Sequence, residues 1–188
     1  MHKIRVETPF RPIYPSPAGL IVSIDANGKH NIMTCAEIFN ISLSRPAILG
    51  IALRKATYTH GLIVNAKEFT VNLPTIDILE KVDQIGAVSG KDGLDKFTAF
   101  NLTPITSAEV APPIVGECPV NLECVLLSMT EVGDHDLFIG KIVAMHVDAD
   151  KADEKQLPIV EKLDAFLYAE GGYYRFGEKL GTHGFTNS

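Results

Sequence analysis

Residues 54 to 60 combine side chains that could hold an anion. The segment reads Arg-Lys-Ala-Thr-Tyr-Thr-His, so two cations and two threonine hydroxyls follow the apolar run at 47 to 53. Thr57 or Thr59 can cap a short helix here, and the N–H groups of a helix N-terminus bind phosphate readily, above all beside an arginine. The same residues also fit a plain helix cap beside two solvated cations, and both interpretations stay open.

A second candidate is the segment 30 to 36, His-Asn-Ile-Met-Thr-Cys-Ala, which follows an Asn-Gly pair at 27 and 28. Asn-Gly is the strongest short-range hairpin signal, so two paired strands should flank it. Polar and apolar residues in the segment neither alternate cleanly nor repeat at helical spacing. We interpret it either as a strand edge whose backbone amides face a ligand or as an ordinary strand.

The other reactive side chains have simpler interpretations. Cys118 and Cys124 lie six residues apart with no histidine pair nearby, so we expect them to be small buried residues. His60 and His146 are expected to be structural. The sequence lacks the glycine-rich dinucleotide and phosphate loops, the Gly-x-Ser-x-Gly elbow, Cys-x-x-Cys and His-Glu-x-x-His. Rossmann, kinase-type, hydrolase and zinc sites therefore lose support, and we predict no metal site.

Short strands with tight turns should position these residues. The C-terminal half lacks the strand–helix alternation of a doubly wound sheet, whereas closing a sheet into a barrel removes exposed edges. The predicted fold is therefore mainly β with short helices. Strands are expected at 19–25, 47–53, 68–73, 120–130 and 137–147, a short helix at 57–66, and one or two short helices within 75–100.

Composition and charge exclude several classes of protein. The 188 residues, of which 46% are hydrophobic and 21% charged, fit one domain over residues 1–188 with a core of its own. The net charge of -6, without a long run of Lys or Arg, disfavours nucleic acid. No apolar run is long enough for a membrane span or a signal peptide, and three cysteines are an odd number. We expect a cytoplasmic protein without a nucleic-acid or membrane partner.

The order of short motifs along the chain resembles flavoredoxin-like members of the flavin-reductase-like family. Each motif alone is weak, but seven in order are specific, and the resemblance covers roughly residues 10 to 185. They are His-Asn-Ile-Met-Thr from 30, the segment 54–63 with Tyr-Thr-His-Gly-Leu-Ile, Lys-Glu-Phe-Thr-Val-Asn-Leu-Pro from 67, Ser-Gly at 89 with Asp-Lys-Phe at 95, Glu-Cys-Pro-Val-Asn-Leu-Glu-Cys from 117, Gly-Asp-His at 133 with Phe-Ile-Gly at 138, and Tyr-Arg-Phe-Gly-Glu-Lys-Leu-Gly from 174.

The resemblance implies an FMN-binding split β-barrel, Greek-key-like, that works as a homodimer with FMN held noncovalently near the subunit interface. It places His135 as the catalytic residue beside an incoming nicotinamide. The aromatic residues at 166 to 176 exceed what such a barrel can bury, which also favours an interface there. The implied cofactor-binding residues are Asn31, Ile32, Met33, Thr34 and Cys35 along the isoalloxazine edge, Arg54, Tyr58 and Thr59 around the phosphate, and Ser89, Gly90 and Lys96 on the ribityl-phosphate side.

On the same resemblance we expect an FMN-dependent oxidoreductase that passes electrons from NADH or NADPH to flavin, ferric iron or a protein acceptor. The alternative is a non-enzymatic FMN electron carrier that a protein partner reduces, and a third possibility is a sensory or storage flavin protein. Relatives often carry a Trp soon after the Asn-Ile-Met-Thr element, whereas this chain has Ala36 and Glu37 there and no Trp anywhere. What packs near the ring, and hence the electron donor, stays open.

Overall fold

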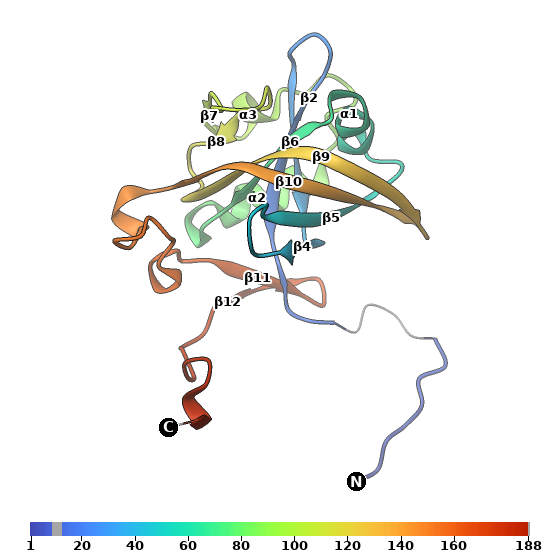
Figure 1. Ribbon diagram of the computed structural model, residues 1–188. Coiled ribbons are helices and arrows are strands. Elements are labelled where there is room, and N and C mark those ends of the chain that lie inside the picture. The colour runs from blue at the N-terminus through green and yellow to red at the C-terminus, as the bar shows by residue number, and fades with distance from the viewer. Residues whose placement is uncertain (9–12, 188) are drawn as a thin grey trace.

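A seven-stranded antiparallel sheet forms the body of the protein in a computed structural model that describes residues 1–8 and 13–187 (Figure 1). Residues 9–12 and 188, which the predicted domain includes, lie outside this description. The strand order is β3-β2-β6-β9-β10-β5-β4, so β3 and β4 are the edge strands. The strands are β2 (Gly19–Ile24), β3 (His30–Cys35), β4 (Ile38–Ser42), β5 (Ile48–Arg54), β6 (Glu68–Leu73), β9 (Val120–Val132) and β10 (His135–Val147).

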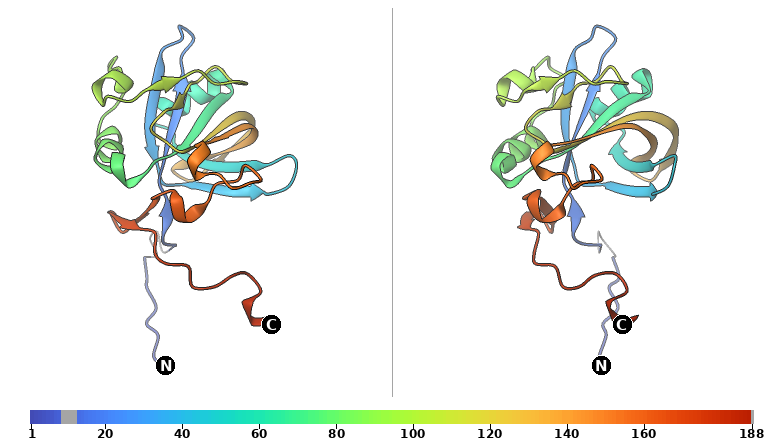
Figure 2. Two further views of the ribbon diagram at one scale, coloured as in Figure 1. Left: turned by 90° about the vertical axis from the view of Figure 1, so that its left-hand side faces the viewer. Right: turned by 60° about the vertical axis from the view of Figure 1, so that its left-hand side comes forward.

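The sheet curls around an apolar interior to which all seven strands contribute (Figure 2). Phe69, Phe138 and Ile51 are fully buried there, and Ile63 of the helix α1 (Tyr58–Ala66) packs on the same cluster. At Gly140 a Cβ atom would come within 2.6 Å of the Phe69 ring, and the β10 pairing shifts register at this point, where a bulge lets a strand bend. The predicted split β-barrel, mainly β with short helices, is confirmed.

Two helices cover the outer face of β2 and β3. Side chains alternate along a strand, so Leu20 and Val22 of β2 point away from the barrel interior, while Ile21 points into it. Val82 and Ile85 of α2 (Leu79–Ala87) and the first turn of α3 (Lys96–Ala99) pack on this outer face. Because β2 is buried on both faces, its sequence is apolar except for Ser23 and does not alternate.

Several predicted elements agree closely with the structure. The Asn-Gly pair lies in the turn of the β2–β3 hairpin, with Gly28 at φ 83°, a conformation that glycine adopts without steric cost. β6 has its predicted bounds, and α1 begins at Tyr58 with Thr57 at the cap position. The Thr57 hydroxyl, however, donates to the Arg54 carbonyl at 2.8 Å and forms no helix cap.

Other elements differ from expectation. β4 has no predicted counterpart, and β9 and β10 extend further toward each other than predicted, so only Gly133 and Asp134 connect them. In the C-terminal hairpin Phe166 is buried and Tyr173 packs on the outer core, so the predicted exposed aromatic surface there is reduced to Tyr174 and Phe176. No helix within the described residues is long and apolar enough to cross a membrane.

Two small sheets complete the fold, and both terminal segments extend away from the barrel (Figures 1 and 2). One joins the N-terminal segment to the C-terminal hairpin; the other lies in the connection between α3 and β9. The first consists of β1 (Ser16–Pro17), β11 (Phe166–Ala169) and β12 (Gly172–Arg175), and the second of β7 (Pro104–Ile105) and β8 (Ile114–Val115).

Candidate functional site

A cavity of about 340 Å³ lies between the edge strand β3, the N-terminus of α1 and the segment that leads from α2 to residue 90. Because β3 pairs only with β2, the backbone groups along its other side are not used by the sheet. The segment 30 to 36 is therefore both a regular strand and an edge beside the cavity. Eight of the eleven predicted cofactor-binding residues line it: Asn31, Met33, Thr34, Tyr58, Thr59, Ser89, Gly90 and Lys96.

Ile32, Cys35 and Arg54 do not line this cavity. The Ile32 side chain packs in the outer core and Cys35 in the barrel interior, both fully or almost fully buried. Arg54 is exposed at the end of β5, where its carbonyl accepts the Thr57 N–H at 3.0 Å. His135, the predicted catalytic residue, also lies outside the cavity, opposite Arg54 in the β5–β10 pairing. These two residues therefore stand next to each other, one tight turn away from the cavity wall.

Asn31 presents an unsatisfied acceptor to the cavity. Its Nδ2 donates to Thr59 Oγ1 at 2.8 Å, which ties β3 to α1, but its buried Oδ1 has no hydrogen-bond partner among the described residues. A Cβ atom on Gly90 would come within 2.0 Å of this oxygen, so the backbone can pass here only without a side chain. A buried acceptor without a partner costs about 1 to 3 kcal/mol. A ligand that donates an O–H or N–H to Asn31 would recover that energy.

The N-terminus of α1 forms the wall next to Asn31 and contacts it through Thr59. Thr57, Tyr58 and Thr59 line the cavity in the first turn of the helix, which contains no acidic residue. The first N–H groups of a helix have no partner within it and carry a partial positive charge. This wall can bind an anion such as a phosphate, and the hydroxyls of Tyr58 and Ser89 add further polar groups to the cavity.

Lys96 holds the opposite wall together. Its ammonium is buried and donates to the carbonyls of Ile32 at 2.9 Å, Ile85 at 3.2 Å and Val88 at 2.7 Å. These three bonds use all the donors of a lysine and join β3 to the end of α2. Burial lowers the pKa of Lys96 to about 8. Lys96 thus contributes its charge and the position of the 85–88 segment to the cavity, rather than a free donor.

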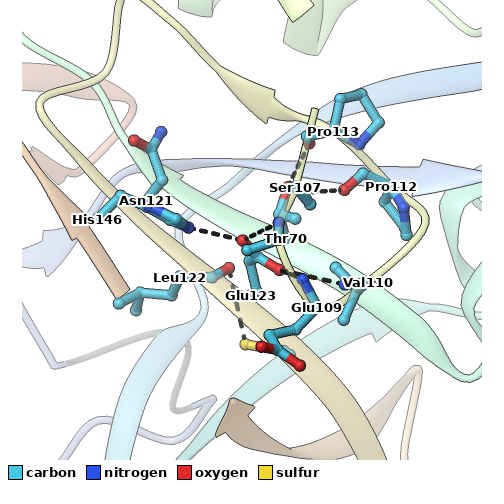
Figure 3. Close-up of polar contacts among 12 residues, drawn as sticks. Thr70, Ser107, Glu109, Val110, Pro112, Pro113, Asn121, Leu122, Glu123 and His146 are labelled. Atoms are coloured by element: carbon cyan, nitrogen blue, oxygen red, sulfur yellow. Dashed lines mark hydrogen bonds and ion pairs between the residues drawn. The ribbon is translucent and has the colours of Figure 1, made fainter. Parts of the chain in front are cut away.

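A second polar cluster surrounds Glu123 on β9, away from the cavity (Figure 3). This fully buried carboxylate accepts the backbone N–H groups of Ala108, Glu109 and Val110, and His146 Nε2 lies 2.6 Å from it. Burial by itself raises the pKa of Glu123, but these hydrogen bonds outweigh it and leave the pKa below its usual value. The cluster anchors the loop between β7 and β8, which fits a structural role for His146.

His60 takes part in a similar structural contact. Its Nε2 lies 2.8 Å from the buried Asp136 carboxylate on β10, and its ring packs edge-on against Phe138. Cys118 and Cys124 are buried, as predicted, and burial raises the pKa of both thiols. None of these residues lines the cavity.

Residues 11–177 match the model of the flavin reductase like domain. This chain belongs to that family. A solved structure of flavoredoxin from Desulfovibrio vulgaris (Miyazaki F) superimposes with a TM-score of 0.88 at 31% identity, over 98% of this chain and 100% of that one. A protein of Archaeoglobus fulgidus is 40% identical over 140 residues, which are 74% of this chain and 77% of the relative. The NADH:riboflavin 5'-phosphate oxidoreductase of Streptomyces pristinaespiralis is 26% identical over 66% of this chain and 67% of its own.

The groups that line the cavity of this flavin reductase like protein are compatible with a flavin phosphate. The α1 N-terminus suits one phosphate, and the Asn31 oxygen suits a hydroxyl or ring N–H. No sequence motif indicates that residues 85 to 88 line the cavity, because they do so only through the packing of the end of α2 against β3. Only the adjacent Ser-Gly pair at 89 signals this wall in the sequence.

Proposed function

We propose that this protein binds one FMN noncovalently in the cavity and transfers electrons from NADH or NADPH to flavin, ferric iron or a protein acceptor. The observation that carries the proposal is a cavity lined both by the N-terminus of α1 and by Asn31, whose buried Oδ1 has no hydrogen-bond partner among the described residues. FMN has hydroxyls that can donate to the Asn31 oxygen and a single phosphate that can bind at the α1 N-terminus. The similarity to a riboflavin 5'-phosphate oxidoreductase supports the choice of FMN.

When bound, the flavin supplies the redox chemistry, and the chain supplies position and shielding from water. Thr57 to Thr59 would hold the phosphate at the α1 N-terminus, with Ser89 and Gly90 in the neighbouring wall. Asn31 would accept a hydrogen bond from a ligand hydroxyl, and the buried Lys96 would offset part of the negative charge. Met33 and Thr34 continue the site along β3 toward the ring.

The nicotinamide donor is proposed to approach His135 and Arg54, which are adjacent in the β5–β10 pairing. Arg54 is a cation that can meet a nucleotide phosphate, and His135 Nδ1 is 2.8 Å from Asp134 Oδ1, which orients its ring. The second candidate function is an FMN carrier reduced by another protein, favoured by the flavoredoxin match over nearly the whole chain. We also propose a cytoplasmic homodimer.

Titration with FMN and riboflavin tests the proposal. Purified protein should take up about one FMN per chain and bind riboflavin more weakly, because the helix N-terminus has no phosphate to meet in riboflavin. Failure to take up FMN would overturn it. Consumption of NADH or NADPH by pure holoprotein with an added acceptor identifies the reductase; reduction only through a second redox protein identifies the carrier.

His135→Ala tests the position of the donor. We expect the variant to slow flavin reduction by NAD(P)H in stopped-flow experiments and to bind FMN as the wild type does, since His135 lies outside the cavity. His183→Ala, a change in the exposed C-terminal segment, is the matched control and should reduce normally. An unchanged reduction rate in His135→Ala would show that the nicotinamide donor does not bind near this end of β10.

A further inference from the structure

The first turn of α1 is tied to two strands that lie apart in the sheet. Thr59 Oγ1 accepts a hydrogen bond from Asn31 of β3, and the next residue, His60, has its Nε2 2.8 Å from Asp136 Oδ2 of β10. In the strand order, β2, β6 and β9 separate β3 from β10. Two consecutive residues therefore fix this turn at two separate points.

The contact between His60 and Asp136 is buried. The Asp136 side chain is 2% exposed and the His60 side chain 14%, and the His60 ring packs edge-on against Phe138 at 5.0 Å between ring centroids. Burial by itself raises the pKa of Asp136, but its contacts with His60 and the Lys55 ammonium outweigh burial and keep that pKa below its usual value. Asp136 is therefore ionised at neutral pH. Because an ionised carboxylate only accepts hydrogen bonds, His60 Nε2 is the donor.

Stability alone does not account for this buried pair. Asp136 Oδ1 has no hydrogen-bond partner among the described residues, and Lys55 Nζ, on a half-exposed side chain, is 3.5 Å away. Apolar side chains of similar size often stabilise a protein as well as such a pair does, whereas a buried polar contact can specify one geometry. The geometry that His60 can specify is the direction of the α1 N-terminus.

This N-terminus lacks the usual means of fixing a first helical turn. The N-cap residue Thr57 forms no cap hydrogen bond, and its hydroxyl donates to the Arg54 carbonyl instead. The buried apolar residues of α1, Leu62 and Ile63, belong to its second turn. The two polar contacts to β3 and β10 therefore hold the first turn in place.

We propose that His60 and Asp136 are positioning residues for the phosphate of the bound flavin: they hold the first turn of α1 so that its free N–H groups point into the cavity. This rests on the proposed function. Neither residue lines the cavity, so both act through the helix. Hydrogen bonds weaken steeply when donor and acceptor are misaligned, so a tilt of this turn would lower the affinity for a phosphate. Contacts with the rest of the flavin would not change.

Comparing FMN with riboflavin tests this role, because the two ligands differ by the phosphate. Replacing both groups by leucine removes the contact without leaving a buried charge alone, and the neighbouring side chains of Leu53 and Phe138 are apolar. In the double variant His60→Leu, Asp136→Leu we expect the dissociation constant of FMN to rise about tenfold and that of riboflavin by less than about twofold.

His146→Leu is the matched control. It also takes a histidine Nε2 from a buried carboxylate, that of Glu123, but away from the cavity. It should lower the melting temperature and keep the wild-type ratio of FMN to riboflavin affinity. Asp136→Asn should keep that ratio as well, because its side-chain oxygen can still accept from His60.

Phosphorus NMR of bound FMN gives a readout at the phosphate itself. The resonance should move in the double variant and stay at its wild-type position in His146→Leu. Circular dichroism and the melting temperature of each apo variant show that the comparison is made between folded proteins.

An unchanged ratio of FMN to riboflavin affinity in the double variant would overturn the positioning role. Equal weakening of both ligands would overturn it too, since it would show a general loss of structure at the cavity. Absence of FMN binding in the wild type would instead overturn the proposed function, so the two failures differ.

Discussion

Lys96 is a charged side chain that the fold keeps almost completely out of water, at 4% exposed. Three backbone carbonyls replace its hydration, and two of them, from Ile85 and Val88, belong to the wall of the proposed flavin site. Its burial therefore does two things at once. It places a positive charge beneath a site for an anion, and it fixes the end of α2 against β3.

Lys96→Met should lower the free energy of unfolding of the apoprotein by about 1 to 3 kcal/mol, because buried carbonyls lose their donor. The pH dependence should also change. With a pKa of about 8 when folded and 10.5 when unfolded, Lys96 releases its proton earlier in the folded state, so between these values its contribution makes stability rise with pH.

Urea unfolding at pH 7, 8.5 and 10 measures both effects. Lys96→Met should lack the increase in the free energy of unfolding between pH 8.5 and 10. Lys91→Met, at an exposed lysine, should keep the wild-type pH profile. A rise of the same size in Lys96→Met would show that another group is responsible.

At this scale the sequence predicts residue types better than contacts. The Asn-Ile-Met-Thr and Tyr-Thr motifs identify Asn31, Thr34 and Thr59, which line the cavity. It does not reveal that Lys96 bonds to Ile32, 64 positions away, since this depends on how α3 meets β3. Arg54 lies outside the cavity wall, at the end of β5, so the phosphate contact that its motif suggested stays a prediction.

At the scale of elements, the loop from 107 to 113 is held by two carboxylates on neighbouring strands. Glu123 of β9 accepts three of its N–H groups, and Glu68 of β6 accepts the Ala111 N–H at 2.8 Å. This loop packs on the outer face of β6 and β9, where Thr70, the cross-strand partner of Glu123, also donates to the Pro113 carbonyl (Figure 3). It is therefore a covering element fixed by charge rather than by regular secondary structure.

Glu123→Gln should destabilise the protein by about 1.5 to 3 kcal/mol at pH 7, because an amide cannot accept from all these donors. Since the folded pKa lies below the usual value of 4.5, the stability from this carboxylate is complete above about pH 4.5 and is lost as the pH falls toward the folded pKa. Wild type should therefore lose more stability than the variant on acidification below pH 4.5.

Thermal unfolding at pH 3 to 7 makes this comparison. Glu154→Gln, at an exposed position, serves as control and should follow the wild type. Amide hydrogen exchange should also be faster at 108 to 110 in Glu123→Gln alone. Protection as in wild type would show that other contacts hold the loop.

The order of helices and long strands follows from periodicity and turn residues, whereas β4 does not. β4 exposes Phe39 and Ile41 together with polar neighbours, so its sequence has no clean alternation to detect. Such a strand is specified by pairing with β5, which the chain brings back at 48 to 54. Pairing across the sheet is a tertiary contact, and local sequence carries little of it.

At the scale of the whole molecule, apolar side chains remain exposed on two parts of the barrel. Ile41 and Leu43 lie at β4, and Leu127 and Val132 lie toward the hairpin end of β9, each between 46% and 85% exposed. Exposed apolar surface of this kind often marks an interface. It supports the proposed homodimer better than the aromatic hairpin does, since most of that hairpin packs on the protein's own core.

Light scattering across a dilution series tests the dimer. We expect a mass near twice the 20.4 kDa chain, falling on dilution, and Leu127→Lys should shift the equilibrium toward monomer. The control is Lys155→Glu, an exposed charge change in the region after β10, which should leave the mass unchanged. A monomeric mass at all concentrations would contradict the proposed homodimer.

The unpaired oxygen of Asn31 has a consequence for the chain inside a cell. The empty protein bears the cost of that buried acceptor, and in the proposed FMN complex a ligand hydroxyl would relieve it, so the proposal links cofactor supply to the folded population. A change of 1 to 2 kcal/mol can alter the abundance of a marginally stable protein several-fold through proteolysis of its unfolded form. The amount of this protein should then follow the riboflavin status of its host, with no need for a change in transcription.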